Sequence, residues 1–281
     1  MTFSIVAWDE SCDPPEWGVA VASKFLAVGA AVPWAQAGVG AVATQALANL
    51  AYGPAGLRLL AEDRPADEVV AALTGADEDR QHRQLGVVDA AGRAATYTGD
   101  ECLHWAGGRT GSGYCCQGNI LTGPEVVDCM CDAFESTEGE LAARLLAALR
   151  AGDAAGGDSR GRQSAAVYVV REGGGYGGGI DRSVDLRVED HGAPVDELER
   201  LFSLHRLYFP RPEDLDFVPL DDALRAEMTT LLTSAGYEVA EGAAGLRAAL
   251  YRYVGTENLE ERWTEDDTVE RGILEHLRRA G

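Results

Sequence analysis

Short apolar runs joined by tight turns constrain the fold of this chain more than any other feature. TFSIVAW and EWGVAVASKF predict two strands, and the segment DESCDPPE between them contains the chain breakers Pro14 and Pro15. RQLGVVDAAGRAATYTG predicts a second hairpin around its D-A-A-G turn. Because hairpins replace a regular strand–helix–strand alternation, we expect antiparallel sheets covered by helices. The number of apolar strands indicates two sheets that face each other, with the helices outside.

The remaining segments of the first 209 residues predict further strands and amphipathic helices. The strands are GVGAVATQ, SAAVYVVRE and SVDLRVED. The helices are PAGLRLLAED, DEVVAALTG, PEVVDCMCDAFES, EGELAARLLAALRAG and PVDELERLFSLHRLYF.

A proline-rich acidic stretch divides the chain into two parts. FPRPEDLDFVP contains three prolines and predicts a linker. Beyond it, DDALRAEMTTLLTSAGYEV, AAGLRAALYRYV and TVERGILEHLRR predict three short amphipathic helices. We therefore expect a main domain at residues 1–209, a linker at 210–218 and a small helical domain at 219–281.

Charge and composition limit the partners that we expect. The 281 residues are 46% hydrophobic and carry a formal net charge of −22, so the chain is an acidic protein able to bury a sizeable core. This charge repels phosphate groups, and we expect neither nucleic acid nor an anionic membrane as a partner. The first residues lack the basic and apolar regions of a signal peptide, which predicts a cytoplasmic protein.

Six cysteines raise the question of a metal site. Cys115 and Cys116 are adjacent in a predicted strand, so their side chains point to opposite faces. Cys129 and Cys131 lie two apart in a predicted helix, about 200° apart around its axis. Neither pair has the spacing of a zinc site, and we expect no metal and reduced, partly buried cysteines.

Thr2 is the first candidate for chemistry. A threonine hydroxyl is a poor nucleophile and needs a base. If Met1 is removed, Thr2 carries both a hydroxyl and an α-amine, whose ordinary pKa near 7.7–8.0 leaves it largely neutral near pH 8. A terminal threonine then holds nucleophile and base in one residue. The alternative is that a chain starting with Met-Thr has no catalytic purpose there.

Lys24 is the only lysine of the chain and closes the second predicted strand, VAVASK. In a hairpin its side chain can return to the start of the first strand. An ammonium group there would lower the pKa of the terminal amine and stabilise an alkoxide on Thr2. The alternative is a solvated lysine at a strand end.

Polar residues follow two other buried strands. Thr44 and Gln45 in ATQALAN stand where a strand meets a helix, a place that presents side chains to ligands; Thr44 as a helix cap is the alternative. In QGNIL, Gln117 and Asn119 lie beside an apolar strand, and an amide there can stabilise an oxyanion. A structural amide with satisfied hydrogen bonds is the plain alternative.

The glycine-rich stretch GGDSRGRQSAA precedes a strand and contains Asp158 and Arg160. Exposed backbone amides and a guanidinium group suit a substrate carboxylate. An Asp158–Arg160 ion pair that only orders the loop is the alternative. The chain has no G-x-S-x-G, no H-E-x-x-H and no dinucleotide fingerprint, so no histidine-based triad or cofactor motif is expected.

Several of these segments together resemble the domain of unknown function 1028 family, which groups with the N-terminal nucleophile (Ntn) hydrolases. They are TFSIVAWD, WGVAVASKFLAVGAAVPWAQAGVGAVATQ, AYGPAGL, HRQLGVVDAAGRAATYTG, QGNILTGPEVV, AGGDSRGRQSAA and DLRVEDH, and they span about residues 2–209. The tail segments LRAEMTTLLTSAGYEV and LRAALYRYVGTENL resemble a peptidoglycan-binding-like module.

The resemblance implies an α+β fold, a four-layer αββα sandwich with the catalytic residue at the start of the first strand. It makes Thr2 the nucleophile position. The cysteines at 115 and 116 are atypical for the family motif. Besides Thr44 and Lys24, the residues that the resemblance suggests for the substrate pocket are Gln45, Asn119, Asp158, Arg160 and Gln163.

The function that we expect is an amidohydrolase, without metal or organic cofactor, that cleaves a small amide or peptide-like substrate, such as a cell-wall fragment, through an acyl-enzyme on Thr2. The alternative is a non-catalytic ligand-binding protein on the same scaffold. We expect a homo-oligomer, in particular a dimer. The helical tail is expected to bind glycans, and the alternative is that it serves as a dimerisation module.

Overall fold

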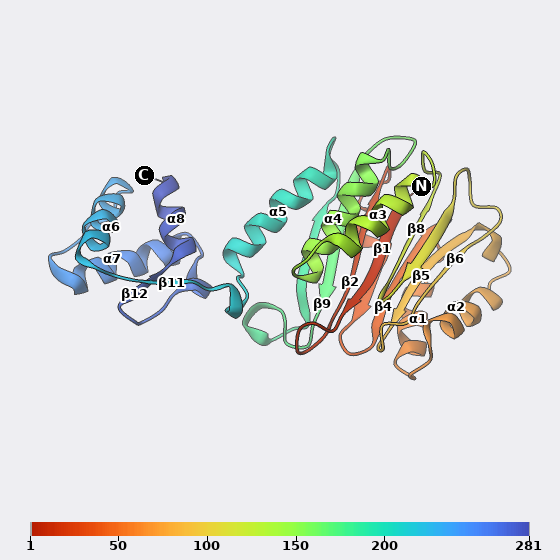
Figure 1. Cartoon of the computed structure of the whole chain (residues 1–281), viewed down its shortest axis with the longest axis horizontal. Helices are drawn as coiled ribbons and strands as arrows, with labels where there is room; N and C mark the ends of the chain where they lie inside the picture. The colour runs from red at the N-terminus through yellow and green to blue at the C-terminus, as the bar shows by residue number, and fades with distance from the viewer. Residues whose placement is uncertain (1, 281) are drawn as a thin grey trace. The chain divides into compact units, whose positions relative to one another are not determined.

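A computed structural model describes residues 2–280, so Met1 and the prediction that it is removed lie outside the described residues. The described part contains eight α-helices and three sheets in which every pair of neighbouring strands is antiparallel, which confirms the mixed α/β class (Figure 1). The chain divides into two compact units, residues 1–201 and 202–281. Each is described by itself.

The larger sheet of the first unit has six strands in the order β10-β9-β2-β1-β8-β7. The central strand β1 pairs with β2 on one side and β8 on the other, as the first predicted hairpin requires. The strands are β1 (Thr2–Asp9), β2 (Glu16–Ser23), β7 (Gly107–Gly111), β8 (Tyr114–Asn119), β9 (Ser164–Val170) and β10 (Arg182–Val188).

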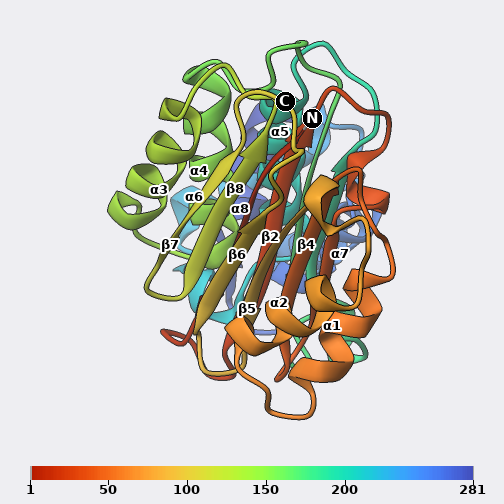
Figure 2. The same ribbon diagram turned by 90° about the vertical axis from the view of Figure 1, so that its right-hand side faces the viewer.

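A second sheet of four strands, in the order β3-β4-β5-β6, packs face to face against the first (Figure 2). Side chains alternate between the two faces of a strand, so Val6 of β1 points toward the second sheet, whereas Phe3 and Ile5 point away from it. Val6 joins Val88 of β5 in one apolar cluster. The strands are β3 (Pro33–Gln36), β4 (Gly40–Ala46), β5 (Arg83–Asp89) and β6 (Ala94–Thr98).

Helices cover the outer face of each sheet (Figure 1). The pair α3 (Glu125–Ser136) and α4 (Leu141–Ala154) packs on the six-stranded sheet, where Phe3 reaches Gly152 of α4. The pair α1 (Tyr52–Leu60) and α2 (Ala66–Gly75) packs on the four-stranded sheet. Each helix buries its apolar stripe against a sheet face, which is the physical reason for its amphipathic sequence.

The second unit is mainly helical. Its helices are α6 (Asp222–Ser234), α7 (Gly242–Thr256) and α8 (Arg271–Ala280), as predicted, and the division between the units falls within α5 (Pro194–Tyr208). These helices share a core of their own, which includes Met228, Leu232, Leu250, Tyr253, Ile273 and Leu277.

Four short strands differ from the sequence prediction, and one of them, β12 (Thr268–Glu270), occupies the first three residues of the predicted helix TVERGILEHLRR. The stretch predicted as a linker contains β11 (Phe217–Pro219), which pairs with β12; its proline is tolerated because the strand is a sheet edge. The edge strands β3 and β7 also escaped prediction. β3 has four residues, and the sequence of β7, GGRTG, has no apolar alternation.

No helix within residues 2–280 has the length and the apolar character that crossing a membrane requires.

Candidate functional site

Thr2 lies at the start of β1, at one edge of the two facing sheets. Its side chain is buried, and its Oγ1 lies 3.1 Å from Oγ of Ser23, the last residue of β2. On the other side, the strand register pairs Thr2 with Asn119, the last residue of β8. The hydroxyl of Thr2 is therefore held between two strand ends. Ser23 was not predicted; its only signal is that it ends a strand directly beside Thr2.

Buried amides fill the space between the sheets next to Thr2. Gln45 Oε1 accepts a hydrogen bond of 2.7 Å from Ser4 Oγ, and Gln45 Nε2 donates to Gln84 Oε1 at 2.8 Å and to the Thr2 carbonyl at 3.4 Å. Gln117 Nε2 donates to Ser4 Oγ at 2.7 Å. These side chains are at most 1% exposed. Because buried polar groups need partners, the hydrogen bonds fix each amide in one orientation.

Gln84 is the centre of this network and was missed by the sequence reasoning. Its Oε1 accepts from both Gln45 and Asn119, the latter at 2.9 Å, and its Nε2 donates to the Gly118 carbonyl at 2.7 Å. The bond to Gln84 uses one of the two amide hydrogens of Asn119. The second hydrogen can serve an oxyanion beside Thr2.

The backbone is strained where β4 and β8 end. Ala46, which follows Gln45, has φ of 71°, and Ile120, which follows Asn119, has φ of 51°. Left-handed backbone is unfavourable for residues with a Cβ atom and is a clear outlier for a β-branched residue. Such strain persists where the surroundings impose it, and it often accompanies functional sites.

Lys24 has a different position from the one expected. Its ammonium group donates to the Arg162 carbonyl at 3.3 Å, and its backbone N–H donates to Asp158 Oδ2 at 2.7 Å. Successive residues of a strand point to opposite sides, so Lys24 points away from the side on which Ser23 contacts Thr2. The contact expected of Lys24 is made by Ser23.

Asp158 ties loops together beside Ser23. Its carboxylate is buried and accepts hydrogen bonds from the backbone N–H groups of Lys24 and Arg160, the latter at 2.9 Å. Arg160 also forms an ion pair with it at 3.2 Å, and the guanidinium side chain is 44% exposed. These contacts are those of the loop-ordering alternative, and they leave part of the Arg160 side chain open to solvent.

The two remaining predicted residues bind neighbouring loops. Thr44 is buried, and its hydroxyl donates to the Asn49 carbonyl at 3.1 Å. Gln163 Nε2 donates to Asp190 Oδ1 at 3.1 Å, at the far side of the 158–162 loop. Gln45 and Asn119 thus lie beside Thr2, whereas Thr44 and Gln163 support the surrounding loops.

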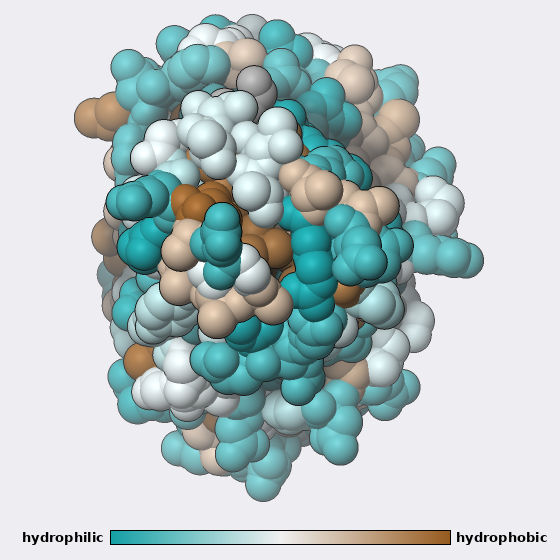
Figure 3. All heavy atoms as spheres, turned by 90° about the vertical axis from the view of Figure 1, so that its left-hand side faces the viewer, coloured by the Kyte–Doolittle hydropathy of each residue, from teal (hydrophilic) through white to brown (hydrophobic). Residues whose placement is uncertain are grey.

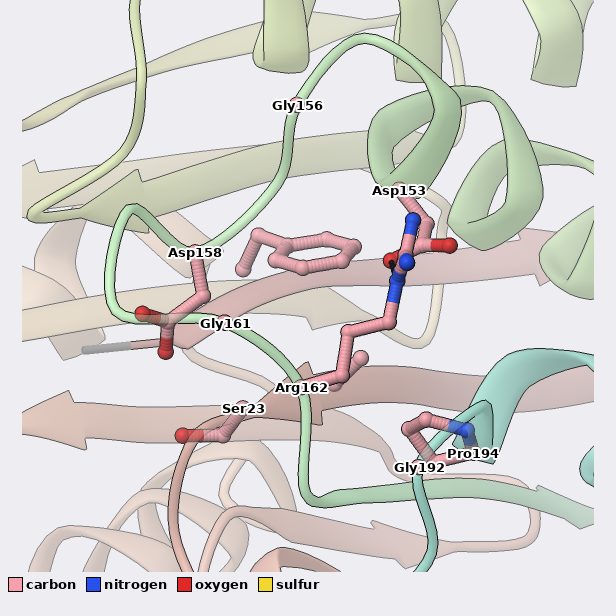
Figure 4. A pocket seen from close by; sticks show the side chains of 10 residues that line it. Ser23, Asp153, Gly156, Asp158, Gly161, Arg162, Gly192 and Pro194 are labelled. Atoms are coloured by element: carbon pink, nitrogen blue, oxygen red, sulfur yellow. Dashed lines mark hydrogen bonds and ion pairs between the residues drawn. The ribbon is translucent and has the colours of Figure 1, made fainter.

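A pocket of about 260 Å³ lies between Ser23 and the 156–162 loop, beside Phe3 and so on the face of β1 opposite to the Thr2 side chain (Figure 4). Figure 4 shows Asp158 and Ser23 at one end, while Arg162 extends to Asp153 at the other, where the two form an ion pair of 2.7 Å. Phe3 also lines the pocket. The pocket therefore offers carboxylate, hydroxyl and guanidinium groups, and it borders Ser23, whose hydroxyl contacts that of Thr2.

The cysteines at 115 and 116 point to opposite faces of β8. Cys115 belongs to the apolar cluster between the sheets, whereas Cys116 lies on the side of α3 and hydrogen-bonds to Cys131. Burial raises the pKa of the Cys115 thiol to about 12. The six cysteines are not joined in disulfides within the described residues, and Cys12, Cys102 and Cys129 are half-buried.

Comparisons with known proteins give matches to two family models and similarity to solved structures. Residues 2–198 match the model "Family of unknown function (DUF1028)", and residues 208–277 match the model "Putative peptidoglycan binding domain". The crystal structure of a DUF1028 protein from Silicibacter pomeroyi is similar with a TM-score of 0.67 and 31% identity, over 73% of this chain and 86% of that chain. No curated protein matches the sequence.

Proposed function

The chain belongs to the DUF1028 family, and from this premise we propose that it is an Ntn amidohydrolase that cleaves a small amide or peptide-like substrate through an acyl-enzyme on Thr2. The observation that carries the proposal is the place of the Thr2 hydroxyl, buried at a sandwich edge between Ser23 and the strand partner Asn119. Two facing sheets with helices outside support the finer assignment to a four-layer αββα sandwich.

The proposed reaction needs only this chain and water. After removal of Met1, the α-amine of Thr2 takes the proton of the Thr2 hydroxyl, and Oγ1 attacks the amide carbonyl carbon. The C–N bond then breaks, the nitrogen leaves with that proton as an amine, and the acyl group remains as an ester on Thr2. A water molecule gives its proton to the α-amine and attacks the ester, which releases a carboxylic acid and restores the hydroxyl.

The neighbouring residues have distinct roles in this proposal. The free amide hydrogen of Asn119 stabilises the oxyanion, because Gln84 holds the amide in place at 2.9 Å. Ser23 orients the Thr2 hydroxyl. Arg160 offers its exposed guanidinium edge to a substrate carboxylate, and Lys24 holds the 158–162 loop through Arg162.

Two substitutions of one residue test the nucleophile. Thr2→Ala removes the hydroxyl, and Thr2→Ser keeps it; both are small changes at a strand start. In a screen of amides and acyl-peptides, we expect Thr2→Ala to lower kcat at least about a thousandfold and Thr2→Ser to retain turnover. Undiminished turnover by Thr2→Ala of any amide that the wild type cleaves would exclude Thr2 as nucleophile.

A non-catalytic ligand-binding protein is the alternative function. It is favoured by the hydrogen bonds that join Gln45, Gln84 and the Gly118 carbonyl, which need no substrate to complete them. Intact-mass spectrometry separates the two functions: a chain that starts at Thr2 favours the hydrolase, and retention of Met1 blocks the amine and favours the binder.

The second unit suggests where the enzyme acts. Its match to a peptidoglycan-binding model supports a role in bringing the enzyme to peptidoglycan or its fragments. The unit contains an apolar pocket of about 130 Å³, and Figure 3, which looks onto the side of α6–α8, shows hydrophobic side chains inside a hollow ringed by hydrophilic ones. The pocket is lined by Leu220, Ala243, Ala244, Leu246 and Leu250, with Arg225 and Arg247 beside them.

Binding to insoluble peptidoglycan by the full chain tests this role. We expect Ala244→Asp, which puts a charge into the pocket at an exposed position, to leave the protein in the supernatant, and the exposed control Tyr251→Ser to co-sediment like the wild type. Dimerisation is the competing role. If Ala244→Asp halves the solution mass and the wild type does not sediment with peptidoglycan, the unit is a dimerisation module.

A further inference from the structure

Five large apolar side chains are exposed on three loops of the first unit. Their exposed fractions range from 50% for Leu50 to 67% for Leu103. Burying one such side chain is worth about 1.5–3 kcal/mol. A cluster of solvent-exposed side chains of this kind is therefore unusual. We call this group the apolar rim; it consists of Phe25, Leu26, Leu47, Leu50 and Leu103.

Two loops of the rim start from residues that contact Thr2, and the third is hydrogen-bonded to the end of β8. Phe25 stands two residues after Ser23, whose hydroxyl contacts that of Thr2, and Leu47 stands two residues after Gln45, which contacts the Thr2 carbonyl. The carbonyl of Leu103 accepts a 3.1 Å hydrogen bond from Ile120, the residue after Asn119. Two residues of extended chain span about 7 Å. All three loops of the apolar rim therefore adjoin the strand ends beside the candidate nucleophile.

The loops of the rim are held in place by hydrogen bonds. Asp77 accepts from Asn49 Nδ2 and from Arg83 Nε, both at 3.0 Å, and Arg83 also donates to the Leu47 carbonyl. The backbone of Lys24 is fixed by Asp158 at 2.7 Å. Since these loops are ordered without a ligand, little conformational entropy is lost when an apolar group binds to them.

We propose that the apolar rim binds the acyl side of the substrate, so that the enzyme acts on amides of apolar carboxylic acids with several carbon atoms. This inference rests on the proposed function, because it places the carbonyl of such an acyl chain at Thr2. A second copy of the chain fits the rim less well, since each copy carries a net charge of −22 and two copies repel each other.

Binding to the Thr2→Ala variant tests the inference without requiring turnover. The probes are acetyl-, butanoyl- and hexanoyl-alaninamide, measured by isothermal titration calorimetry. The affinity should rise about twofold to fourfold for each added methylene, because each one leaves water. Leu47→Ser with Leu103→Ser, added to Thr2→Ala, should weaken hexanoyl binding at least about tenfold and leave acetyl binding unchanged.

Ile180→Ser is the matched control, since Ile180 is 48% exposed in the loop between β9 and β10, which lies at the other end of the strands from Thr2. It should leave the affinity for every probe unchanged. All rim positions are exposed, so thermal unfolding serves to show that the variants fold.

The outcomes separate this inference from the proposed function. Equal affinities for the three probes, as expected for a polar wall fragment, would overturn it. The inference would also be overturned if the rim variant kept its affinities for the probes but changed its solution mass in analytical ultracentrifugation. The rim would then be a contact surface for a second copy of the chain. If the affinity of Thr2→Ala rises with the acyl chain length of the probe but the wild type cleaves no amide, the binding role of the rim is supported and the hydrolase is rejected.

Discussion

The two ends of the layer between the sheets are built from opposite kinds of side chains. Along the inner face of β1, Val6 belongs to an apolar cluster with Val19 and Val88, whereas Ser4, two residues earlier, hydrogen-bonds to Gln45. Both ends are buried and pack the same two sheets. Apolar packing alone explains a stable layer. A buried hydrogen bond adds only about 0.5–1.5 kcal/mol and is costly when one partner is lost, so the amides point to a role of that end beyond stability.

Among the substitutions that test this difference between the two ends, replacement of Gln84 should change the free energy of unfolding most. Gln84→Met keeps the length of the side chain but leaves Asn119, Gln45 and the Gly118 carbonyl without their partner, so we expect a loss of about 3–5 kcal/mol in the free energy of unfolding. At the apolar end, Val88→Ala should cost about 2 kcal/mol. Urea denaturation measures both. If Val88→Ala costs more, the polar network does not dominate its end of the layer.

Polar contacts also hold the loop that carries Leu47 and Leu50. The stability that they contribute depends on pH. Hydrogen bonds from Arg83 and then from Asn49 lower the pKa of Asp77 well below its ordinary value of 3.8. A carboxylate with a lowered pKa stabilises the fold fully above pH 4 to 5, and this contribution is lost as the pH falls through the lowered pKa.

Asp77→Asn should therefore cost about 1–3 kcal/mol at pH 7, because it removes a charged partner of Arg83. The difference from the wild type should shrink below pH 3.8, where Asp77 of the unfolded chain takes up a proton while Asp77 of the folded chain is still charged. Denaturation curves at pH 7 and pH 3 measure this. A difference that does not change with pH would show that the charge of Asp77 is not what holds the loop.

Backbone strain gives the smallest predicted effect. Ala46 is in the left-handed region with φ of 71°, so Ala46→Gly should raise the free energy of unfolding by up to about 1 kcal/mol. Ala43, on the same strand within the apolar cluster, is the control, and Ala43→Gly should lower stability. Destabilisation by both glycines, seen as lower melting temperatures, would mean that Ala46 is not strained.

Alternating and amphipathic patterns predicted most of the fold because they are local. The hairpins of β1–β2 and β5–β6 and the helices follow from them. The edge strands β3 and β7 did not, because they are short or rich in glycine and their pairing is set by distant segments.

The candidate site depended on tertiary contacts in the same way. Gln45 and Asn119 could be selected because each ends a buried strand, and both lie beside Thr2. Gln84 and Ser23 could not, since only the packing of two sheets and the pairing of β1 with β2 bring them there. Lys24 shows how a single position along a strand reverses the side on which a residue lies.

The most direct test of the central claim is to locate a covalent adduct on the protein. A β-lactone opens when a hydroxyl attacks its carbonyl and leaves an ester on that oxygen. After brief treatment, peptide mass spectrometry should find a chain that begins at Thr2 and carries the acyl group on that residue, with no adduct in Thr2→Ala. Retention of Met1, or an equal adduct in Thr2→Ala, would contradict the account.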